Sequence, residues 1–227
     1  MTAQKVNDAP RRPGRPRGTK AGTANREQLM DIALALFARH GIAPVSLNAI
    51  AREAGVTPAM LHYYFTSRDA LVEQLLIERF IPLRNEIGEI FSAHAGDPVV
   101  AFRLLIETLA VMAENNAWLA PLWMQEVIGE MPVMRQLMHQ RFGGDKYASM
   151  LDNVRRWQQE GKLNPALAPE LLFTSVISLV LVPFSRIRAD ERLQALDREA
   201  IARHALAFMM AGIAGNGSPE PAGEPER

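Results

Sequence analysis

The sequence contains no cysteine, and this absence excludes disulfide bonds, thiolate metal sites and cysteine nucleophiles. It also lacks a long apolar run. The longest, residues 171–184, falls short of the ~20 residues that a membrane-spanning helix needs and is interrupted by serines. The N-terminus has no apolar stretch of the kind found in secretory signals. We therefore expect a soluble, cytoplasmic protein with no membrane partner, and its apolar residues (48%) suffice for a core.

Catalytic signatures are absent as well. The sequence holds no Gly-x-Ser-x-Gly elbow, no phosphate-binding loop and no dinucleotide fingerprint that follows a strand. Its five histidines are scattered, and no two stand four residues apart, as zinc ligands on one helix face would. Glu126 and Glu130 stand one helical turn apart and form either a pair of working carboxylates or, more commonly, a solvated helix face. We expect no enzymatic activity, no cofactor and no bound metal.

The clearest local signals in the chain lie within residues 32–71, which predict three short helices with a tight turn between the second and third. Gly41 is expected to end the first helix as a left-handed cap, and Ser46 to cap the start of the second. Gly55 then reverses the backbone, and Thr57-Pro58 starts the third helix. The apolar faces of the first two helices comprise Ile32, Ala33, Leu36, Phe37, Leu47, Ile50, Ala51 and Ala54. This order of signals is typical of a helix-turn-helix, whose second helix enters the DNA major groove.

Charge is distributed unevenly, although the formal net charge of the chain is zero. Residues 1–26 carry seven basic side chains and one acidic side chain, so the remainder is acidic. A basic arm ahead of a helix-turn-helix indicates contact with DNA phosphates, and a solubilising tail is the alternative. The centre of the arm, residues 11–18, resembles the Gly-Arg-Pro core of an AT-hook. Arg15 and Arg17 would there enter the narrow minor groove of A·T-rich DNA.

The helix-turn-helix segment resembles the DNA-binding domain of the TetR family of transcriptional regulators. The matching residues are Ala35, Leu36, Phe37, Gly41, Ser46, Ile50, Ala51, Ala54, Gly55, Val56, Leu61, Tyr63, Tyr64, Phe65, Ser67, Arg68 and Leu71. The match is specific because many positions agree at the correct spacing, rather than one short motif. The family often has a tyrosine where this chain has His62.

The resemblance implies which residues face the DNA bases. Pro58, Ala59 and Met60 match base-facing positions on the recognition helix, and Asn48 would reach the bases from the preceding helix. Because Ala59 and Met60 are apolar, we expect contacts with thymine methyl groups rather than arginine readout of guanine. His62 would donate a hydrogen bond to a phosphate or to a base edge.

The resemblance also implies which residues hold the phosphate backbone. Ser46, Tyr63 and Arg68 match backbone-contacting positions. Thr57 and Tyr64, at the two ends of the recognition helix, complete the predicted DNA-binding set.

Beyond residue 70 the pattern is helical, with no alternating strand pattern. The expected helices span 69–81, 98–114, 118–130, 132–161 with an interruption at 143–144 left open, 169–188 and 192–213. Pro82 predicts a bend or break after Ile81. We therefore predict an all-α fold in four parts. These are a basic, disordered arm (1–24), a helix-turn-helix domain (25–70), a helical ligand-binding and dimerisation domain (71–214) and a disordered tail (215–227).

The last two helices are the predicted dimer interface. Residues 171–182 are apolar on all sides and predict a fully buried helix, which one small domain cannot bury alone. On the final helix, Ile201, Ala205, Phe208 and Gly212 form one apolar stripe. Two such helices from each protomer would form an antiparallel four-helix interface of the kind that the TetR family uses. A monomeric bundle core is the alternative, but a single recognition helix seldom supplies enough affinity, so we expect a homodimer.

The middle of the chain is rich in aromatic and methionine side chains. Most of them are expected in the core, but flexible thioethers between aromatic walls also suit an adaptable apolar pocket. The family resemblance implies a small-molecule site among the central helices. The candidate ligand-binding residues are Trp118, Trp123, Glu126 and Met138.

Together these signals predict a sequence-specific transcriptional regulator. It would be a homodimeric repressor that binds a double-stranded DNA operator and leaves it when a small-molecule inducer binds. The alternative is a helical protein-interaction module without regulatory DNA binding.

Overall fold

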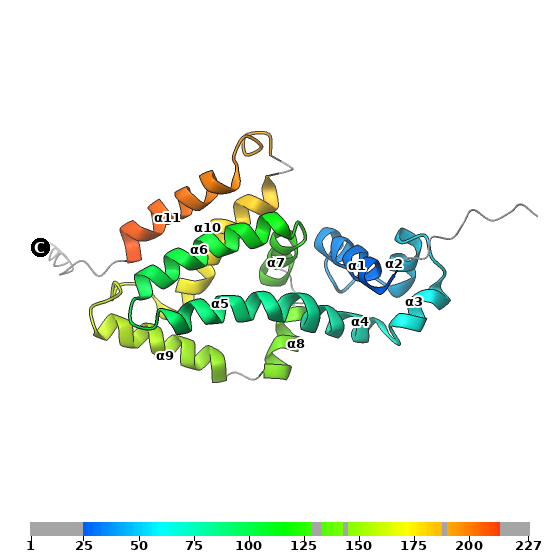
Figure 1. The fold of residues 1–227 in the computed structure, drawn as a ribbon, viewed down its shortest axis with the longest axis horizontal. Helices are drawn as coiled ribbons and strands as arrows, with labels where there is room; N and C mark the ends of the chain where they lie inside the picture. The colour runs from blue at the N-terminus through cyan, green and yellow to red at the C-terminus, as the bar shows by residue number, and fades with distance from the viewer. Residues whose placement is uncertain (1–24, 129–132, 143–144, 188–189, 214–227) are drawn as a thin grey trace, which may run out of the picture.

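A computed structural model describes residues 25–128, 133–142, 145–187 and 190–213, and every regular element in these ranges is a helix. The all-α prediction is therefore confirmed. The helices α1 to α3 form one end of the molecule, and a larger bundle around α6, α10 and α11 forms the other (Figure 1). The predicted basic arm, with Arg15 and Arg17, and the predicted tail lie outside the described residues.

The first four helices begin where the sequence supplies a capping side chain. The helices are α1 (Arg26–His40), α2 (Leu47–Glu53), α3 (Pro58–Tyr64) and α4 (Arg68–Leu75). Asn25 forms a capping box with Gln28, and the hydroxyl of Thr57 accepts a hydrogen bond from the backbone N–H of Met60. Gly41 ends α1 with a positive φ of 79°, but its ψ of 163° differs from the left-handed helical cap that we expected. Gly55 has a φ of 65° in the turn between α2 and α3, as predicted.

The helix does not break at Pro82, where a bend or break was expected. Instead α4 continues through one π-helical segment, η1 (Leu76–Phe80), into α5 (Ile81–Ala93), and Figure 1 shows one long, continuous path. Pro82 has no N–H, and its ring would crowd the carbonyl group one α-helical turn earlier. The wider π turn directly before it, in which the N–H of Ile81 bonds to the carbonyl oxygen of Leu76, accommodates the proline without ending the helix.

Six helices follow α5. They are α6 (Pro98–Asn115), α7 (Leu119–Ile128), α8 (Val133–Phe142), α9 (Asp145–Gln159), α10 (Pro169–Arg186) and α11 (Arg198–Ile213). The last helix begins later than predicted, because Arg192 bonds back to Asp190 and holds the preceding segment in a turn. Asp197 then caps α11, accepting a hydrogen bond of 2.7 Å from the backbone N–H of Ala200.

Two apolar clusters form the core. The first fills the space among α1 to α4 and extends into the rest of the molecule through Leu76 of η1, Leu122 of α7 and Met134 of α8. The second lies among α6, α9, α10 and α11, around Phe102 and Trp157. Because the first cluster does not end at residue 70, the helix-turn-helix is packed directly onto the bundle rather than linked to it by a flexible segment.

The two C-terminal helices expose part of their apolar surface. Among the described residues, α10 is the one helix long and apolar enough to span a membrane by length and composition. It packs here against α6, α7 and α11. Only 22% of its residues are buried in the protomer, which agrees with the expectation that one small domain cannot bury this helix alone. Leu171, in its first turn, is 62% exposed.

The predicted stripe on α11 is divided between two faces. Ile201 and Ala205 point into the protomer core, where they are joined by Met209 and Ile213 one and two turns later. Phe208 is 67% exposed and lies outside that core row. Phe208 is exposed because the buried residues follow one another at a spacing of four. A row with this spacing stays on nearly one face of the helix, and Phe208 does not belong to it.

Candidate DNA interface

The exposed face of α3 is held in place by one buried residue on its opposite face. Leu61 is fully buried in the first cluster, and Phe65, which ends the helix, is buried beside it. Pro58, Ala59 and His62 are exposed on the outer side. This arrangement fixes the orientation of the short helix while leaving its outer side chains free to contact a ligand.

Tyr63 and Tyr64 have different roles although they are adjacent. Tyr63 is 82% exposed, the largest exposure of any large hydrophobic side chain among the described residues. Tyr64 is partly buried against the first cluster and meets the ring of Tyr63 edge-on, with 5.2 Å between the ring centroids. The Tyr64 ring therefore supports Tyr63, whose hydroxyl group points to the surrounding solvent. Met60 is also partly buried, so only part of its side chain faces outward.

The start of α2 lies next in the helix-turn-helix. The hydroxyl of Ser46 accepts a hydrogen bond of 3.2 Å from the backbone N–H of Ala49, as predicted for an N-cap. Asn48 is exposed in the first turn of α2. Both Ser46 and Asn48 are thus accessible to DNA.

Arg68 uses its guanidinium group inside the protein. Its Nε donates to the carbonyl oxygen of Val45 at 2.9 Å, and its Nη2 donates to the carbonyl oxygens of Ala43, at 3.2 Å, and Ile42. These bonds fasten the start of α4 to the loop between α1 and α2. Sequence reasoning missed this role, because the partners are backbone atoms more than twenty residues away. The geometry supports a positioning role for Arg68, and its predicted phosphate contact remains a prediction.

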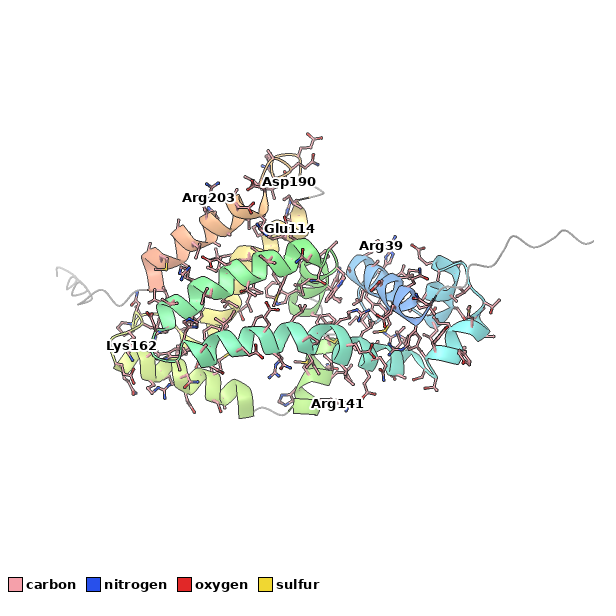
Figure 2. The ribbon with its side chains drawn as sticks, viewed as in Figure 1. Arg39, Glu114, Arg141, Lys162, Asp190 and Arg203 are labelled. Atoms are coloured by element: carbon pink, nitrogen blue, oxygen red, sulfur yellow. The ribbon has the colours of Figure 1, made fainter. Side chains whose placement is uncertain are left out.

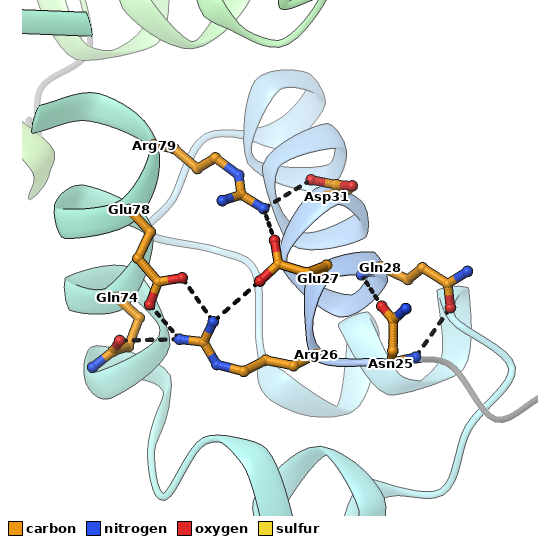
Figure 3. A network of polar contacts seen from close by, with 8 residues as sticks. All are labelled: Asn25, Arg26, Glu27, Gln28, Asp31, Gln74, Glu78 and Arg79. Carbon is orange, nitrogen blue, oxygen red and sulfur yellow. Dashed lines mark hydrogen bonds and ion pairs between the residues drawn. The ribbon is translucent and has the colours of Figure 1, made fainter. Parts of the chain in front are cut away.

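A network of charged side chains joins α1 to the long α4–η1–α5 path, as Figure 3 shows. Arg26 donates from Nη1 to a carboxylate oxygen of Glu78 at 2.7 Å and from Nη2 to Gln74 at 3.0 Å. Arg79 pairs with Glu27, the residue after Arg26 in the first turn of α1. The hydrogen bond from Arg26 lowers the pKa of the Glu78 carboxyl group, and the same bond raises the pKa of Arg26. The orientation of α1 is thereby linked to the π-helical segment that holds Glu78 and Arg79.

The helix-turn-helix segment itself carries no net charge. Residues 25–70 contain four arginines and four acidic side chains. Arg26 and Arg68 are engaged inside the protein, and Arg39 pairs with Glu53 at 2.7 Å. Attraction to a polyanion must therefore come largely from residues outside this segment, and the basic arm is the part of the sequence that offers it.

The four predicted ligand-binding residues do not all pack against the same apolar cluster. Trp118 packs on Phe80 of η1, with 4.8 Å between ring centroids, and borders a cleft beside α1. Trp123 packs against the second cluster, whereas Met138 packs against the first. A carboxylate oxygen of Glu126 accepts a hydrogen bond of 2.8 Å from the backbone N–H of Met134, at the start of α8. Glu130, its proposed carboxylate partner, lies outside the described residues.

The cleft beside α1 has a volume of about 550 Å³ and lies between α1 on one side and α6, α7 and α10 on the other. Sequence reasoning missed its residues on α1, which are Asp31, Ala35, Ala38 and Arg39. Their spacing of three and four residues is the signal that could have identified this second face. No group of three or more His, Asp or Glu side chains able to hold a metal ion occurs among the described residues.

The known proteins that this chain resembles in sequence are transcriptional regulators. Residues 29–75 match the family model described as bacterial regulatory proteins of the tetR family. The regulator UidR of Escherichia coli K12 is 22% identical over 200 residues, which cover 83% of this chain and 92% of UidR. The regulator AcrR of Shigella flexneri is 30% identical over 120 residues, covering 49% of this chain and 54% of AcrR.

Solved structures of similar fold are matched over most of their length. The ketosteroid transcriptional regulator KstR2 of Mycobacterium tuberculosis has a TM-score of 0.65 at 19% identity, covering 86% of this chain and 97% of KstR2. SmeT in complex with triclosan has a TM-score of 0.56 at 20% identity, covering 88% of this chain and 99% of SmeT. At these identities the structures support the fold of the part of the chain that they cover, whereas the family model locates the helix-turn-helix.

Proposed function

Because this chain belongs to the TetR family of DNA-binding transcriptional regulators, we propose that it acts as a homodimeric repressor that leaves its operator when a small molecule binds. The observation that carries the proposal is the outward face of α3, anchored by Leu61 and bearing the exposed Tyr63. A regulator of bacterial genes would work in the cytoplasm, where the DNA is. A helical interaction module without regulatory DNA binding is not favoured, since the matched segment is the DNA-binding one.

In the proposed complex, α3 lies in the major groove. Pro58, Ala59 and Met60 face the bases from the first turn of the helix, and Asn48 reaches them from α2. The short apolar surface formed by Ala59 and the exposed part of Met60 suits thymine methyl groups. His62, exposed on the same helix, donates to a phosphate or to a base edge.

Phosphate contacts hold the helix in register. Ser46 and Tyr63 supply hydroxyl groups on either side of α3, and Thr57 and Tyr64 lie at its two ends. Arg15 and Arg17 of the arm follow the adjacent minor groove and supply the positive charge that the helix-turn-helix lacks. We retain residues 25–70 as the DNA-binding unit and 71–214 as the ligand-binding and dimerisation unit.

A dimer matches the exposed apolar side chains of the last two helices. Leu171 on α10, together with Phe208 and Met210 on α11, is exposed in the single chain, and a second copy would bury these side chains. Dimerisation also places two α3 helices on one face of the duplex, which raises affinity and specifies a two-fold operator.

Release by a small molecule is supported by the similar structures. SmeT was solved in a complex with triclosan, and KstR2 is described as a ketosteroid regulator. For this chain we keep Trp118, Trp123, Glu126 and Met138 as candidate contacts within the bundle. A ligand would act by binding the DNA-competent and DNA-incompetent dimers with different affinity.

The direct test is a gel-shift with DNA flanking the protein's own gene, followed by binding to a panel of operator variants. Tyr63→Phe should weaken binding to all variants alike, by about 1 kcal/mol, since a phosphate contact carries no sequence information. Met60→Ala should instead change which base is preferred, by about 1–3 kcal/mol at one position. Absence of any retarded complex would contradict an operator in the DNA that flanks the protein's own gene. Uniform effects of both substitutions would contradict the proposed orientation of α3.

A further inference from the structure

The cleft beside α1 separates the DNA-binding helices from the bundle. Its first wall is the outer face of α1, and its second wall is formed by the end of α6, the start of α7 and the end of α10. Figure 2 labels Arg39 on α1 and Glu114 at the end of α6 that is directed towards α1. A volume of about 550 Å³ is within the usual range for sites that hold a small organic molecule.

Small side chains leave this space open. Ala35 and Ala38 line the cleft from α1, Ala113 lines it from the end of α6, and Ala117 lines it from the turn between α6 and α7. Larger apolar side chains would close the gap, whereas four methyl groups leave room for a flat molecule between the helices. Trp118 also lines the cleft, so one wall of the cleft is aromatic.

The charged side chains at the edge of the cleft already have partners within the protein. Arg39 pairs with Glu53 at 2.7 Å, and Glu114 lies 3.2 Å from the guanidinium group of Arg198. Asp31, the third, lies 3.6 Å from Arg79. A charged ligand would have to displace one of these pairs, whereas an uncharged one would leave all three intact.

The polar group from the end of α10 is satisfied as well. The hydroxyl of Ser185 donates to the carbonyl oxygen of Val182 at 2.7 Å, within its own helix. What remains for a ligand is alanine methyl groups, the Trp118 ring and the apolar side chains of Phe184 and Ile187. The cleft therefore selects for apolar area rather than for charge.

We propose that this cleft binds neutral, flat aromatic molecules, and that their binding is coupled to DNA binding. Ligand binding is coupled to DNA binding because the cleft borders α1, so a bound ligand contacts a helix of the DNA-binding domain directly. It also contacts Trp118, which packs on Phe80 of the π-helical segment, and that segment holds α1 through Glu78 and Arg26. A ligand that moves either wall thus changes how α1, and with it α3, is oriented. This coupling rests on the proposed function, whereas the binding site itself does not.

The site is tested with the neutral fluorophore N-phenyl-naphthylamine, whose emission rises in apolar surroundings. The full chain should bind it saturably, and Ala35→Phe, which fills the cleft from the α1 wall, should weaken binding by about tenfold or more. Ala117→Phe fills it from the other wall and should have the same effect. Ala148→Phe is the matched control, because Ala148 is exposed on α9, away from the cleft, and it should leave the affinity unchanged. Circular dichroism shows that each variant is folded.

The outcomes separate the site from its regulation. Equal affinity of the fluorophore for the parent chain, Ala35→Phe and Ala117→Phe would overturn the site. If the variants lose the fluorophore and the parent releases its operator when the fluorophore is added, site and coupling both hold. If fluorophore binding depends on Ala35 but no operator is bound, the proposed function fails and the site stands. If it depends on Ala35 but operator affinity is the same with and without fluorophore, the coupling is wrong.

Discussion

The two ends of the molecule both expose large side chains, but of different chemistry (Figure 1). At the α3 end, Tyr63 is 82% exposed and carries a hydroxyl group, with His62 beside it. On α10 and α11, Leu171 and Phe208 are 62% and 67% exposed and carry only hydrocarbon. Water solvates the first surface well, and a phosphate oxygen can replace that water. The second surface gains about 25 cal/mol for every Å² that an apolar partner covers, so it suits another copy of the chain.

The largest expected effect comes from a charge placed on the hydrocarbon surface. Phe208→Glu would bury an unpaired carboxylate in the proposed interface, at a cost of several kcal/mol, and should convert the dimer to monomer. Arg203→Glu is the control, since Arg203 is exposed on the same helix and already polar, and it should leave the dimer intact. Sedimentation of both variants measures this. A dimer that persists in Phe208→Glu would place the interface elsewhere.

A charge at Val180 would not probe the same exposed surface, although Val180 lies in the apolar segment 171–182 that the sequence assigns to the dimer interface. Its side chain is fully buried in the second cluster of the protomer. Val180→Asp should therefore unfold the chain rather than separate two folded protomers. The sequence shows that α10 is apolar on all sides, but only the packing against α6 and α7 decides which side faces inward.

The second prediction concerns the source of positive charge at the DNA-binding end of the molecule. Deleting residues 1–24 removes the arm that carries Lys5, Arg11, Arg12, Arg15, Arg17 and Lys20. If about four of these engage phosphates, the log–log dependence of operator affinity on salt should become shallower by roughly 3–4 units per protomer. The remaining helix-turn-helix has no net charge, so little of the slope should survive. A slope that is unchanged after the deletion would identify the arm as a solubilising tail.

Local signals predicted the helix-turn-helix well. Local signals act over a few residues: Ser46 and Thr57 cap helices with their hydroxyl groups, and Gly55 adopts a positive φ in a turn. Such effects can be predicted from the adjacent residues in the sequence. The role of Arg68 could not be deduced in this way, because its partners lie in a loop that only the tertiary fold brings near. The DNA contacts themselves remain predictions.

The third prediction concerns that loop. Arg68→Ala leaves the carbonyl oxygens of Ile42, Ala43 and Val45 without their donor, and we expect a loss of about 1–3 kcal/mol in unfolding free energy. Urea unfolding at a fixed protein concentration measures it. Arg52→Ala is the control, because Arg52 is an exposed arginine on α2, and it should change stability little. If Arg68→Ala instead keeps full stability and weakens operator binding, Arg68 contacts phosphate as the family resemblance implied.

The bundle was predicted less completely, for physical reasons. Proline in a helical pattern predicted a bend or break at Pro82, but the π-helical segment before it accommodates the missing N–H, and the sequence pattern does not reveal that segment. The candidate pocket residues were chosen by chemical type. Trp118 and Met138 pack against the first cluster and Trp123 against the second, because the direction of each side chain depends on helix crossings that the sequence does not specify.

The smallest predicted effect is at the network that joins α1 to the π-helical segment. Because the hydrogen bond from Arg26 lowers the pKa of Glu78 in the folded protein, the ion pair contributes stability above the ordinary glutamate pKa. That contribution is lost as the pH falls from about 5 towards 3. Since both side chains are about 30% exposed, Glu78→Gln should cost no more than about 1 kcal/mol at pH 7.

The pH dependence distinguishes this ion pair from a packing effect. Unfolding free energies of the parent and Glu78→Gln should differ at pH 7 and converge as the pH falls towards 3, because the parent carboxyl group then becomes protonated in the folded state as well. Glu89→Gln, an exposed carboxylate on α5 outside the network, should match the parent at both values. A difference that stays constant with pH would mean that the Glu78 side chain acts through shape alone. The electrostatic link between α1 and the π-helical segment would then be wrong.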